Sequence, residues 1–412
     1  MIDKQRLQEN FFAMKKFSLP GEGITRLAFS DEDWQARDFI MKKMQAANLA
    51  VREDAFGNIF GRRQGSNPAL PPVTLGSHID SVPEGGNFDG VAGTLAALEV
   101  LTAMQEDDFL NEHPVEMIVF MAEESSRFGL ATIGSKVMTG QIDAQKLKTL
   151  KDKQGTSLYD ILKERGLEPD AIDSANFKER PKVFLEMHIE QGKVLEAMKK
   201  KIGVVTGIAA PTRIKAILHG HADHSGATPM GLRHDGLCAA AEIILQVEQL
   251  AATTQKPCVG TVGIVQVSPN VMNVIPGDVE LGIDLRSIYD DEKTALAKKV
   301  QQSIQNIAHK RDLIVEIIIL ADDRPVKLGN EIIDFLSDIC EAEDIEYMQM
   351  PSGAGHDAMH MAQLCPTGML FIPCKEGISH HKNEYATIED IALGTQILYK
   401  AICELSKTTC QI

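Results

Sequence analysis

The chain has 412 residues, of which 44% are hydrophobic and 24% are charged, and its formal net charge at pH 7 is −16. These values are typical of a soluble globular protein with two or three domains. The negative charge argues against a nucleic-acid or anionic-membrane partner. No apolar run is long enough to span a membrane, and the first residues, MIDKQRLQENFF, lack a signal-peptide pattern. Seven scattered cysteines, none in a C-x-x-C arrangement, indicate reduced thiols, so we expect a cytoplasmic protein.

The first half of the sequence predicts strands that alternate with helices. Residues 30–50 show apolar residues at helical spacing after a candidate N-cap, Ser30. Strand-like segments follow at PPVTLGSH, PVEMIVFMAEE and PKVFLEMHIEQG, and the helical segment GVAGTLAALEVLTAMQ comes after the first of them. This alternation favours an α/β fold with a mostly parallel sheet, covered on both faces. Ligands of such sheets bind beyond the strand ends.

After about residue 208 the pattern changes to that of an α+β unit. A strand (TRIKAILHG), a helix (GLCAAAEIILQVEQLAA), two strands around a Pro/Asn-rich bend, a long helix and a strand (LIVEIIIL) follow in that order. They predict an inserted domain at 210–325 between the two parts of the first domain, 1–209 and 326–412. Apolar and polar residues alternate in VELGIDLRS, so Arg286 is expected on the open sheet face, either solvated or facing an anion.

Side chains that bind metals or transfer protons follow the predicted strands and recur near the C-terminus. They are His78, Asp80, Asp89, Glu123, Glu124, His188, His380 and His381. Taken singly, each is compatible with a surface turn, a solvated strand end or a packed histidine. Taken together, three imidazoles, one aspartate and one glutamate could hold two divalent ions if Asp89 bridges them.

The proposed ligand types favour zinc and also allow manganese, cobalt or nickel, because nitrogen and oxygen ligands are present without thiolate. Glu123 is then a spare carboxylate that could serve as the base for a water molecule. Asp80 could fix the tautomer of His78. A water activated in this way is suited to the hydrolysis of an amide or a ureide.

Seven motifs follow in the order seen in one enzyme family. They are GSHIDSVPEGGNFDG, AEESSRFG, LEMHIEQG, ADHSGATPMGLRHD, SPNVMNVIPGDVELGIDLRS, SGAGHDA and GISH. From GITRLAFS to YATIED, the chain resembles the zinc amidohydrolases that include N-carbamoyl-L-amino acid hydrolases, allantoate amidohydrolases and β-ureidopropionases. That family belongs to the metallopeptidase clan of aminoacylases and dipeptidases. The resemblance implies an α/β di-metal catalytic domain, an inserted dimerisation or lid domain, and a homodimer.

The resemblance also assigns two metal ions to each subunit. His78, Asp89 and His188 would hold one ion, and Asp89, Glu124 and His380 the other. His380 is chosen over its neighbour His381 because the preceding GIS keeps the register of the motif.

Catalytic and substrate-binding roles follow from the same resemblance. Glu123 matches the general base, and Asp80 matches an orienting aspartate. His224 matches the residue that polarises the scissile carbonyl in the partner subunit's site. Asn273 and Arg286 match the groups that hold the substrate carboxylate. Gln191 and Gly355 match positions that contact the ureido end and the substrate backbone.

The function implied is hydrolysis of the ureido C–N bond of an N-carbamoyl-L-amino acid, a small substrate with a carboxylate, to amino acid, CO2 and ammonia. Allantoate amidohydrolase is the alternative, although GIAAPTRIK is more similar to carbamoylase-type members. A dipeptidase or aminoacylase is disfavoured by His188, because peptidases of the clan carry a carboxylate there. A non-catalytic binding relative is disfavoured by Glu123, because a binder needs no base.

Overall fold

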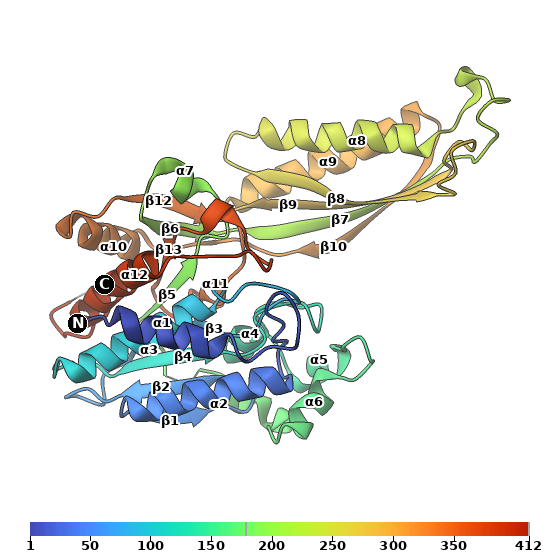
Figure 1. Ribbon diagram of the computed structural model, residues 1–412. Helices are drawn as coiled ribbons and strands as arrows, with labels where there is room; N and C mark the ends of the chain where they lie inside the picture. The colour runs from blue at the N-terminus through green and yellow to red at the C-terminus, as the bar shows by residue number, and fades with distance from the viewer. Residues whose placement is uncertain (178, 411–412) are drawn as a thin grey trace. The chain divides into compact units, whose positions relative to one another are not determined.

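The computed structural model describes residues 1–177 and 179–410, and the chain divides into two compact units (Figure 1). Unit 1 comprises Met1–Thr206, Leu328–Met350 and His356–Ile412, and unit 2 comprises Gly207–Lys327 and Pro351–Gly355. Sequence analysis placed an inserted domain at 210–325. Among the described residues, no helix combines the length and apolarity that a membrane crossing requires.

The larger of the two sheets is parallel at its centre and antiparallel at its edges. Its strand order is β1 (Ala50–Glu53), β2 (Ile59–Arg63), β4 (Val115–Phe120), β3 (Val73–His78), β5 (Val183–Ile189), β13 (Thr367–Ile372), β6 (Ile202–Ile208) and β11 (Val326–Lys327), with β12 (Tyr347–Ser352) also paired to β6. The pairs among β4, β3, β5 and β13 are parallel, and the outer pairs are antiparallel. The predicted α/β fold class is confirmed.

The central strands are buried along their whole length, as expected for parallel strands with both faces covered. Helices α1 (Lys4–Met14), α3 (Val91–Glu106) and α12 (Ile388–Leu405) pack on one another, and α3 and α12 pack on these strands. Helix α3 is apolar almost all round, which explains its nearly complete burial. The other helices of unit 1 are α2 (Asp31–Ala46), α4 (Ile133–Met138), α5 (Ala144–Thr149), α6 (Leu158–Glu164), η1 (Pro169–Ala175), α7 (Val194–Met198), α10 (Asn330–Ala342), α11 (Ala358–Met361) and η3 (Lys375–Gly377).

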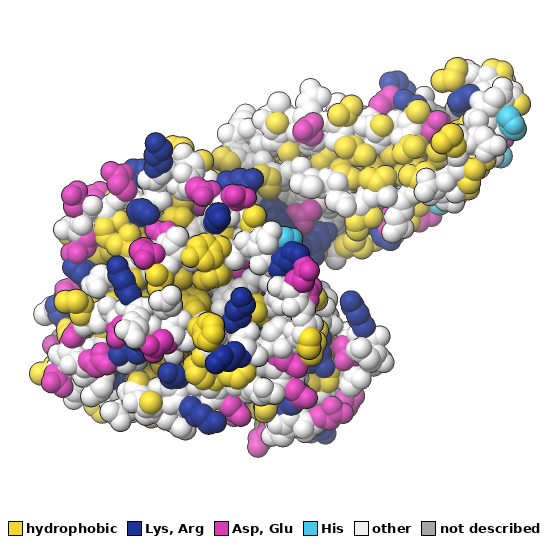
Figure 2. All heavy atoms as spheres, viewed as in Figure 1, with side chains coloured by type: hydrophobic (Ala, Val, Ile, Leu, Met, Phe, Trp, Pro, Cys, Tyr) yellow, Lys and Arg dark blue, Asp and Glu magenta, His cyan; other side chains and the backbone are white. Residues whose placement is uncertain are grey.

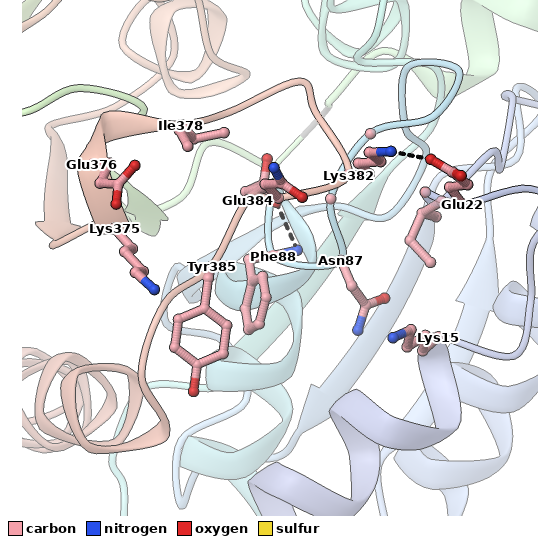
Figure 3. Close-up of a pocket in the computed structure, with 15 residues that line it drawn as sticks. Lys15, Glu22, Asn87, Phe88, Lys375, Glu376, Ile378, Lys382, Glu384 and Tyr385 are labelled. Atoms are coloured by element: carbon pink, nitrogen blue, oxygen red, sulfur yellow. Dashed lines mark hydrogen bonds and ion pairs between the residues drawn. The ribbon is translucent and has the colours of Figure 1, made fainter.

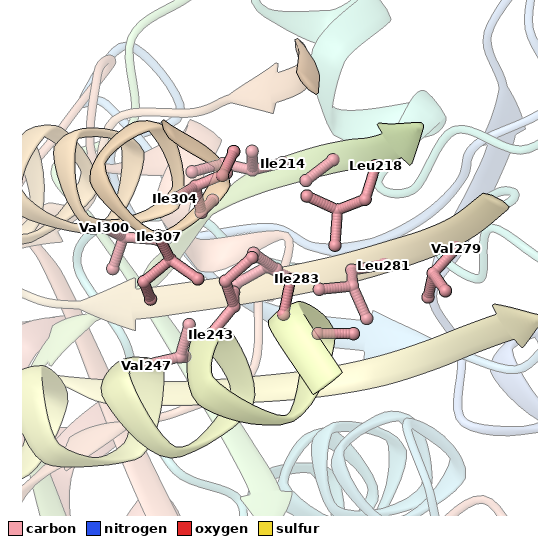
Figure 4. Close-up of a cluster of buried hydrophobic side chains, with 14 of the residues drawn as sticks. Ile214, Leu218, Ile243, Val247, Val279, Leu281, Ile283, Val300, Ile304 and Ile307 are labelled. Carbon is pink, nitrogen blue, oxygen red and sulfur yellow. The ribbon is translucent and has the colours of Figure 1, made fainter. Parts of the chain in front are cut away.

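Unit 2 contains an antiparallel sheet with two helices packed on it. The sheet order is β10 (Ile314–Asp322), β7 (Ala210–His219), β9 (Asp278–Ser287) and β8 (Val259–Ser268), and the helices are α8 (Gly236–Ala252) and α9 (Asp290–Lys310). A short 3-10 helix, η2 (Met230–Leu232), lies between β7 and α8. Figure 4 shows the apolar side chains between helices and strands, among them Ile243, Leu281 and Ile304. The predicted order of strands and helices is confirmed.

The parallel register brings the ends of three central strands to one edge of the sheet. His78, the last residue of β3, is paired with Phe120, the last residue of β4. Leu75 of β3 is paired with Leu185 of β5, so continuing this register by three residues brings His78 level with His188. The segments that follow these strands therefore meet at one place, as expected for the carboxyl edge of such a sheet.

Candidate metal centre

Five side chains that the sequence predicts as metal ligands meet at this edge. They form two groups, in each of which the candidate ligand atoms lie within 4.8 Å of one another. The first group is His78, Asp89 and His188, and the second is Asp89, Glu124 and His380. The structure thus brings together all five residues, whereas their binding of metal stays a prediction.

Asp89 is shared because its two carboxylate oxygens point to different groups. Its Oδ1 lies 3.4 Å from His78 Nε2 and 3.1 Å from His188 Nε2. Its Oδ2 lies 3.1 Å from His380 Nε2, which is also 3.3 Å from Glu124 Oε1. One oxygen per group is the geometry that a bridging carboxylate requires.

Glu124 contributes a buried carboxylate oxygen to the second group. Its Oε1 is buried and accepts no hydrogen bond from the residues that the structure describes. His380 Nε2 is its ion-pair contact, at 3.3 Å, so the hydration that burial removes from this oxygen is only partly replaced. The residues present therefore fit a divalent ion in the second group.

Two imidazoles are oriented by backbone carbonyl groups. His78 Nδ1 lies 3.1 Å from the carbonyl oxygen of Asp80, and His188 Nδ1 lies 2.9 Å from that of Ile189. A carbonyl oxygen only accepts, so each Nδ1 carries the proton. Each Nε2 is then the ring nitrogen that faces Asp89, and it is the nitrogen through which the neutral imidazole would bind a metal.

The charged groups of the centre shift one another's pKa values. Burial raises the pKa of Glu123 and of Glu124. Burial also acts to raise the pKa of Asp89, but the contacts with three imidazoles outweigh it and hold that pKa well below its usual range. The carboxylates of Asp89 and Glu124 raise the pKa of His380 to about 11. The site thus concentrates negative charge that a divalent cation would neutralise.

Asp80 holds the segment that carries the predicted base. Its Oδ1 accepts a hydrogen bond from the backbone N–H of Glu123 (3.2 Å), and its Oδ2 accepts one from that of Glu124 (3.0 Å). Its Oδ1 also lies 3.5 Å from His78 Nδ1. The sequence predicts contact with the imidazole, and the structure adds that this one carboxylate positions both glutamates.

Glu123 lies at the centre with its carboxylate available. Its Oε2 is 3.8 Å from His78 Nε2, and the residue is 8% exposed. Within residues 1–177 and 179–410, no hydrogen bond reaches this carboxylate. It can therefore accept a proton from a water molecule in the site.

Gln191 contacts the bridging residue. Its Nε2 donates a hydrogen bond to Asp89 Oδ2 at 2.7 Å, and Ser379 Oγ lies 3.1 Å from the same oxygen. The sequence predicts that Gln191 contacts the ureido end of a substrate. In this structure its amide holds Asp89, and its buried Oε1 has no partner among the described residues.

Glu384 is a residue of the site that the sequence reasoning missed. Its Oε1 accepts hydrogen bonds from the backbone N–H groups of Phe88 and Asp89, both at 3.0 Å. Its Oε2 accepts from Ser379 Oγ at 2.9 Å and from the backbone N–H of His380 at 3.3 Å. One buried carboxylate thus ties the loop of the bridging ligand to the loop of His380. The available signal was its place in GISHHKNE, four residues after His380.

The backbone of the centre includes several left-handed residues. Gly90 has φ 63°, and a Cβ there would lie 2.4 Å from ring atoms of His78, so this position requires glycine. Ala122, Gln191 and His380 have φ values of 56°, 56° and 55°. Such a conformation costs about 1–3 kcal/mol per non-glycine residue and is found mainly where function demands it.

Of the two adjacent histidines near the C-terminus, His380 belongs to the centre. The Nδ1 of His381 instead accepts a hydrogen bond from the backbone N–H of Asn383 at 3.2 Å. The register argument from GIS therefore selected the histidine that the structure places beside Asp89.

In unit 2, His224 and Asn273 lie on neighbouring segments. His224 forms a β-bridge with Val274, and the Ser225 N–H donates to the Asn273 carbonyl oxygen at 3.1 Å. His224 Nδ1 accepts hydrogen bonds from two backbone N–H groups, at 3.0 and 3.2 Å. Its proton is therefore on Nε2, which is exposed and free to donate to a carbonyl oxygen.

Arg286 lies on the open face of the sheet in unit 2, as the alternation in its strand predicts, but it is already paired. Its Nε donates to Asp284 Oδ1 at 2.7 Å, its Nη2 to Asp284 Oδ2 at 3.3 Å, and its Nη1 to the Gly353 carbonyl oxygen at 3.1 Å. A guanidinium has five N–H groups, so two remain. Gly355, two residues beyond Gly353, is exposed in the same unit.

The similarity to known proteins extends over both units. Residues 74–404 match the model of Peptidase family M20/M25/M40. An N-carbamoyl-L-amino acid amidohydrolase of Geobacillus stearothermophilus is 38% identical over 99% of this chain and 100% of its own length. A ureidoglycolate hydrolase of Oryza sativa subsp. japonica is 39% identical over 98% of this chain and 85% of its own. The crystal structure of a hydantoinase/carbamoylase family amidase from Burkholderia multivorans superposes with a TM-score of 0.93, at 33% identity and 98% coverage of both chains.

Proposed function

The chain belongs to Peptidase family M20/M25/M40 and is a hydrolase of amide C–N bonds, and we propose that its substrates are N-carbamoyl-L-amino acids. Water would cleave the ureido C–N bond and release the amino acid, CO2 and ammonia. The observation that carries the hydrolytic proposal is Asp89, with one oxygen toward each ligand group and the Glu123 carboxylate nearby. The full-length similarity to a carbamoylase supports the substrate. Ureidoglycolate is the second candidate, because a relative of that name is equally similar.

The metal requirement follows from the family, which is metal-dependent. Two divalent ions, zinc or else manganese, cobalt or nickel, would be held by the five residues of the two groups defined above. When bound, they would supply Lewis-acid polarisation and acidify a water molecule.

The residues of the centre would act on protons and charge. Glu123 would accept a proton from the attacking water and return it to the leaving nitrogen, for which a pKa raised by burial is suited. Asp80 would keep Glu123 in place. The Nε2–H of His224 would donate to the carbonyl oxygen as negative charge develops on it. The two remaining N–H groups of Arg286 would pair with the substrate carboxylate.

The geometry of unit 2 supports a homodimer. His224 is bridged to Val274, four residues before β9 begins at Asp278, whereas Arg286 lies near the other end of β9. The strand from Asp278 to Arg286 is roughly 26 Å long at about 3.3 Å per residue. In a carbamoyl amino acid, only a nitrogen and the Cα lie between the ureido and carboxylate carbons. One substrate therefore cannot contact His224 and Arg286 of the same chain.

We propose that Arg286 and His224 of one chain act on different substrate molecules, with His224 and Asn273 reaching the partner's site. The edge strand β8 and the bend that follows it offer a surface for this pairing. Their exposed apolar side chains are Val259, Ile264, Val265, Val271 and Met272. Figure 2 shows hydrophobic side chains along the face that α8 and β8 present. An unpaired strand edge with exposed apolar groups favours association with a second copy.

A substrate panel tests the proposal. The metal-loaded protein is given N-carbamoyl-L- and D-methionine, N-carbamoyl-β-alanine, allantoate, ureidoglycolate and a dipeptide, and ammonia and amine products are measured. We expect the carbamoyl L-amino acid to have the highest kcat/KM, with ammonia and amine in equal amounts. A higher value for ureidoglycolate or allantoate would reassign the substrate. Metal binding without turnover of any compound would favour a binding protein. Glu123→Gln is the control and should bind metal without turnover.

A further inference from the structure

The bridging ligand and the predicted base are held by different parts of unit 1. Glu384 holds the loop of Asp89, and its bond to the Phe88 N–H is drawn in Figure 3. Glu123 instead lies on the segment between β4 and α4, where Asp80 accepts two backbone N–H groups. The carbonyl groups of this buried segment need other partners, because buried backbone acceptors are normally hydrogen-bonded.

Those partners are three consecutive N–H groups that begin at Thr132, the N-cap of α4. The Thr132 N–H donates to the Glu123 carbonyl oxygen at 2.6 Å. The next two N–H groups along the chain donate to the two carbonyl oxygens that precede that of Glu123, both at 2.9 Å. Both polar groups of the Glu123 backbone are therefore fixed, the N–H by Asp80 and the carbonyl by Thr132.

The two facing segments each contain a left-handed residue. Ala122, which precedes Glu123, has φ 56°, and Thr132 has φ 55°. This conformation is unusual for a β-branched residue such as threonine and costs about 1–3 kcal/mol. It persists only where the surrounding contacts enforce it, so the side-chain contacts of Thr132 are important for the place of Glu123.

His360 of α11 makes such a contact. Its Nε2 lies 2.9 Å from Thr132 Oγ1, and both residues are buried. Its Nδ1 lies 3.0 Å from Gln141 Nε2, an amide nitrogen that only donates, so Nδ1 accepts and the ring proton is on Nε2. His360 therefore donates to Thr132, whose hydroxyl donates in turn to the Ala131 carbonyl oxygen at 2.7 Å.

The imidazole stays neutral, and its segment holds α4 at a second point. Burial and, to a smaller extent, the charge of Lys136 lower the pKa of His360 to about 3. Ser135 Oγ, one turn into α4, donates to the carboxylate of Asp357, the N-cap of α11. The segment of α11 thus fixes the first turn of α4, whose N–H groups hold the carbonyl groups beside the predicted base.

We propose that His360 is a positioning residue of the hydrolytic reaction, which holds Glu123 in place through Thr132. This role rests on the function proposed above, in which Glu123 is the base. The hydrogen bonds of His360 to described residues involve none of the five predicted metal ligands. Its loss should therefore lower turnover without loss of metal.

Two substitutions of His360 test this role in the metal-loaded, full-length protein. His360→Leu removes the donor to Thr132, whereas His360→Gln can still present an amide N–H near the place of Nε2. We expect His360→Leu to lower kcat for the best substrate of the panel about 10–100-fold, because a displacement of about 1 Å can cost about 100-fold. KM and the metal content from elemental analysis should stay at wild-type values, and His360→Gln should recover most of the lost kcat.

Thr132→Val tests the same contact from its other partner. It removes the hydroxyl that accepts from His360 but keeps the β-branched shape and the backbone N–H. Its kcat should also fall, and the double variant with His360→Leu should be no slower than His360→Leu alone, because both changes break one contact.

His113→Leu is the matched control. His113 is also a buried histidine of unit 1, with Nδ1 donating to the Pro71 carbonyl oxygen at 2.8 Å, but it precedes β4, whereas Glu123 follows that strand. Its kcat should equal that of the wild type, and thermal unfolding shows that each variant is folded.

The outcomes separate this role from the function on which it rests. A wild-type kcat in His360→Leu or in Thr132→Val would refute the role of His360 alone. So would a loss of kcat that accompanies an equal loss of metal, or that His113→Leu shows as well, because a general loss of packing would then explain it. Absence of turnover in the wild-type protein would refute the proposed function and this role with it.

Discussion

The distance between His224 and Arg286 in unit 2 leads to a complementation prediction. Glu123→Gln removes the proposed base from unit 1, and His224→Ala removes the proposed carbonyl donor from unit 2. Each homodimer should be impaired, with His224→Ala lowering kcat about 10²–10³-fold, as for loss of an oxyanion donor. If His224 acts in the partner's site, a mixed dimer has one site that combines an intact Glu123 with an intact His224.

The size of the recovery follows from random pairing. When equal amounts of the two variants exchange subunits, half of the dimers are mixed and each contains one intact site of two, so activity should reach about a quarter of wild type. Ammonia release from the best substrate of the panel measures it. Differently tagged subunits show by co-purification that exchange has taken place.

A second mixture provides the control. Glu123→Gln and His188→Ala both lie in unit 1, so neither site of their mixed dimer is intact and no recovery is expected. If the first mixture also stays at the sum of its two components after proven exchange, His224 does not act across the dimer. The reasoning from the length of β9 would then be wrong.

Further predictions concern the centre and the core of unit 2. Gly90→Ala should abolish metal binding, measured by elemental analysis, because the new Cβ would collide with His78. Gly129→Ala is the control and should retain metal binding, because Gly129 also has a positive φ (72°) but no atom lies within 4 Å of its Cβ. Asp80→Asn should retain metal but lower kcat about 10–100-fold in steady-state assays, because one of its two oxygens no longer accepts a backbone N–H. Leu281→Ala should cost about 2.7–5 kcal/mol in urea unfolding, because Leu281 is fully buried between sheet and helices. Wild-type metal content in Gly90→Ala would contradict the close contact with His78, and an unchanged kcat in Asp80→Asn would contradict the positioning role of Asp80. A decrease in the free energy of unfolding below about 1 kcal/mol in Leu281→Ala would contradict its packing in the core.

The sequence was sufficient to predict where the centre lies. His78 and His188 each end an apolar segment, and the ends of parallel strands share an edge, so their meeting follows from topology. The alternation around Arg286 likewise predicted its place on the open sheet face, and the structure confirms that placement. Patterns with a fixed period are therefore reliable here, because a strand leaves each side chain only two directions.

The contacts made by loop residues could not be predicted in the same way. Gln191 has a left-handed backbone and its amide donates a hydrogen bond to Asp89, and neither feature follows from the sequence pattern. Glu384 lies in GISHHKNE, where the sequence draws attention to the histidines. Only the folded loop shows that its carboxylate accepts hydrogen bonds from the backbone of Phe88 and Asp89 and from that of His380. The guanidinium of Arg286 is paired with Asp284, two residues before it on the same sheet face. This pairing depends on side-chain torsions that the alternation leaves open.

The sharing of Asp89 between two ligand groups has a consequence for synthesis on the ribosome. The first group is complete once His188 has been made, but the second must wait for His380, 192 positions later. At about 5–20 residues per second, that delay is roughly 10–40 s. During this interval a nascent chain has only the first ligand group, and Asp89 Oδ2 still lacks its contact with His380. A protein cut short anywhere before that histidine would never complete the second ligand group.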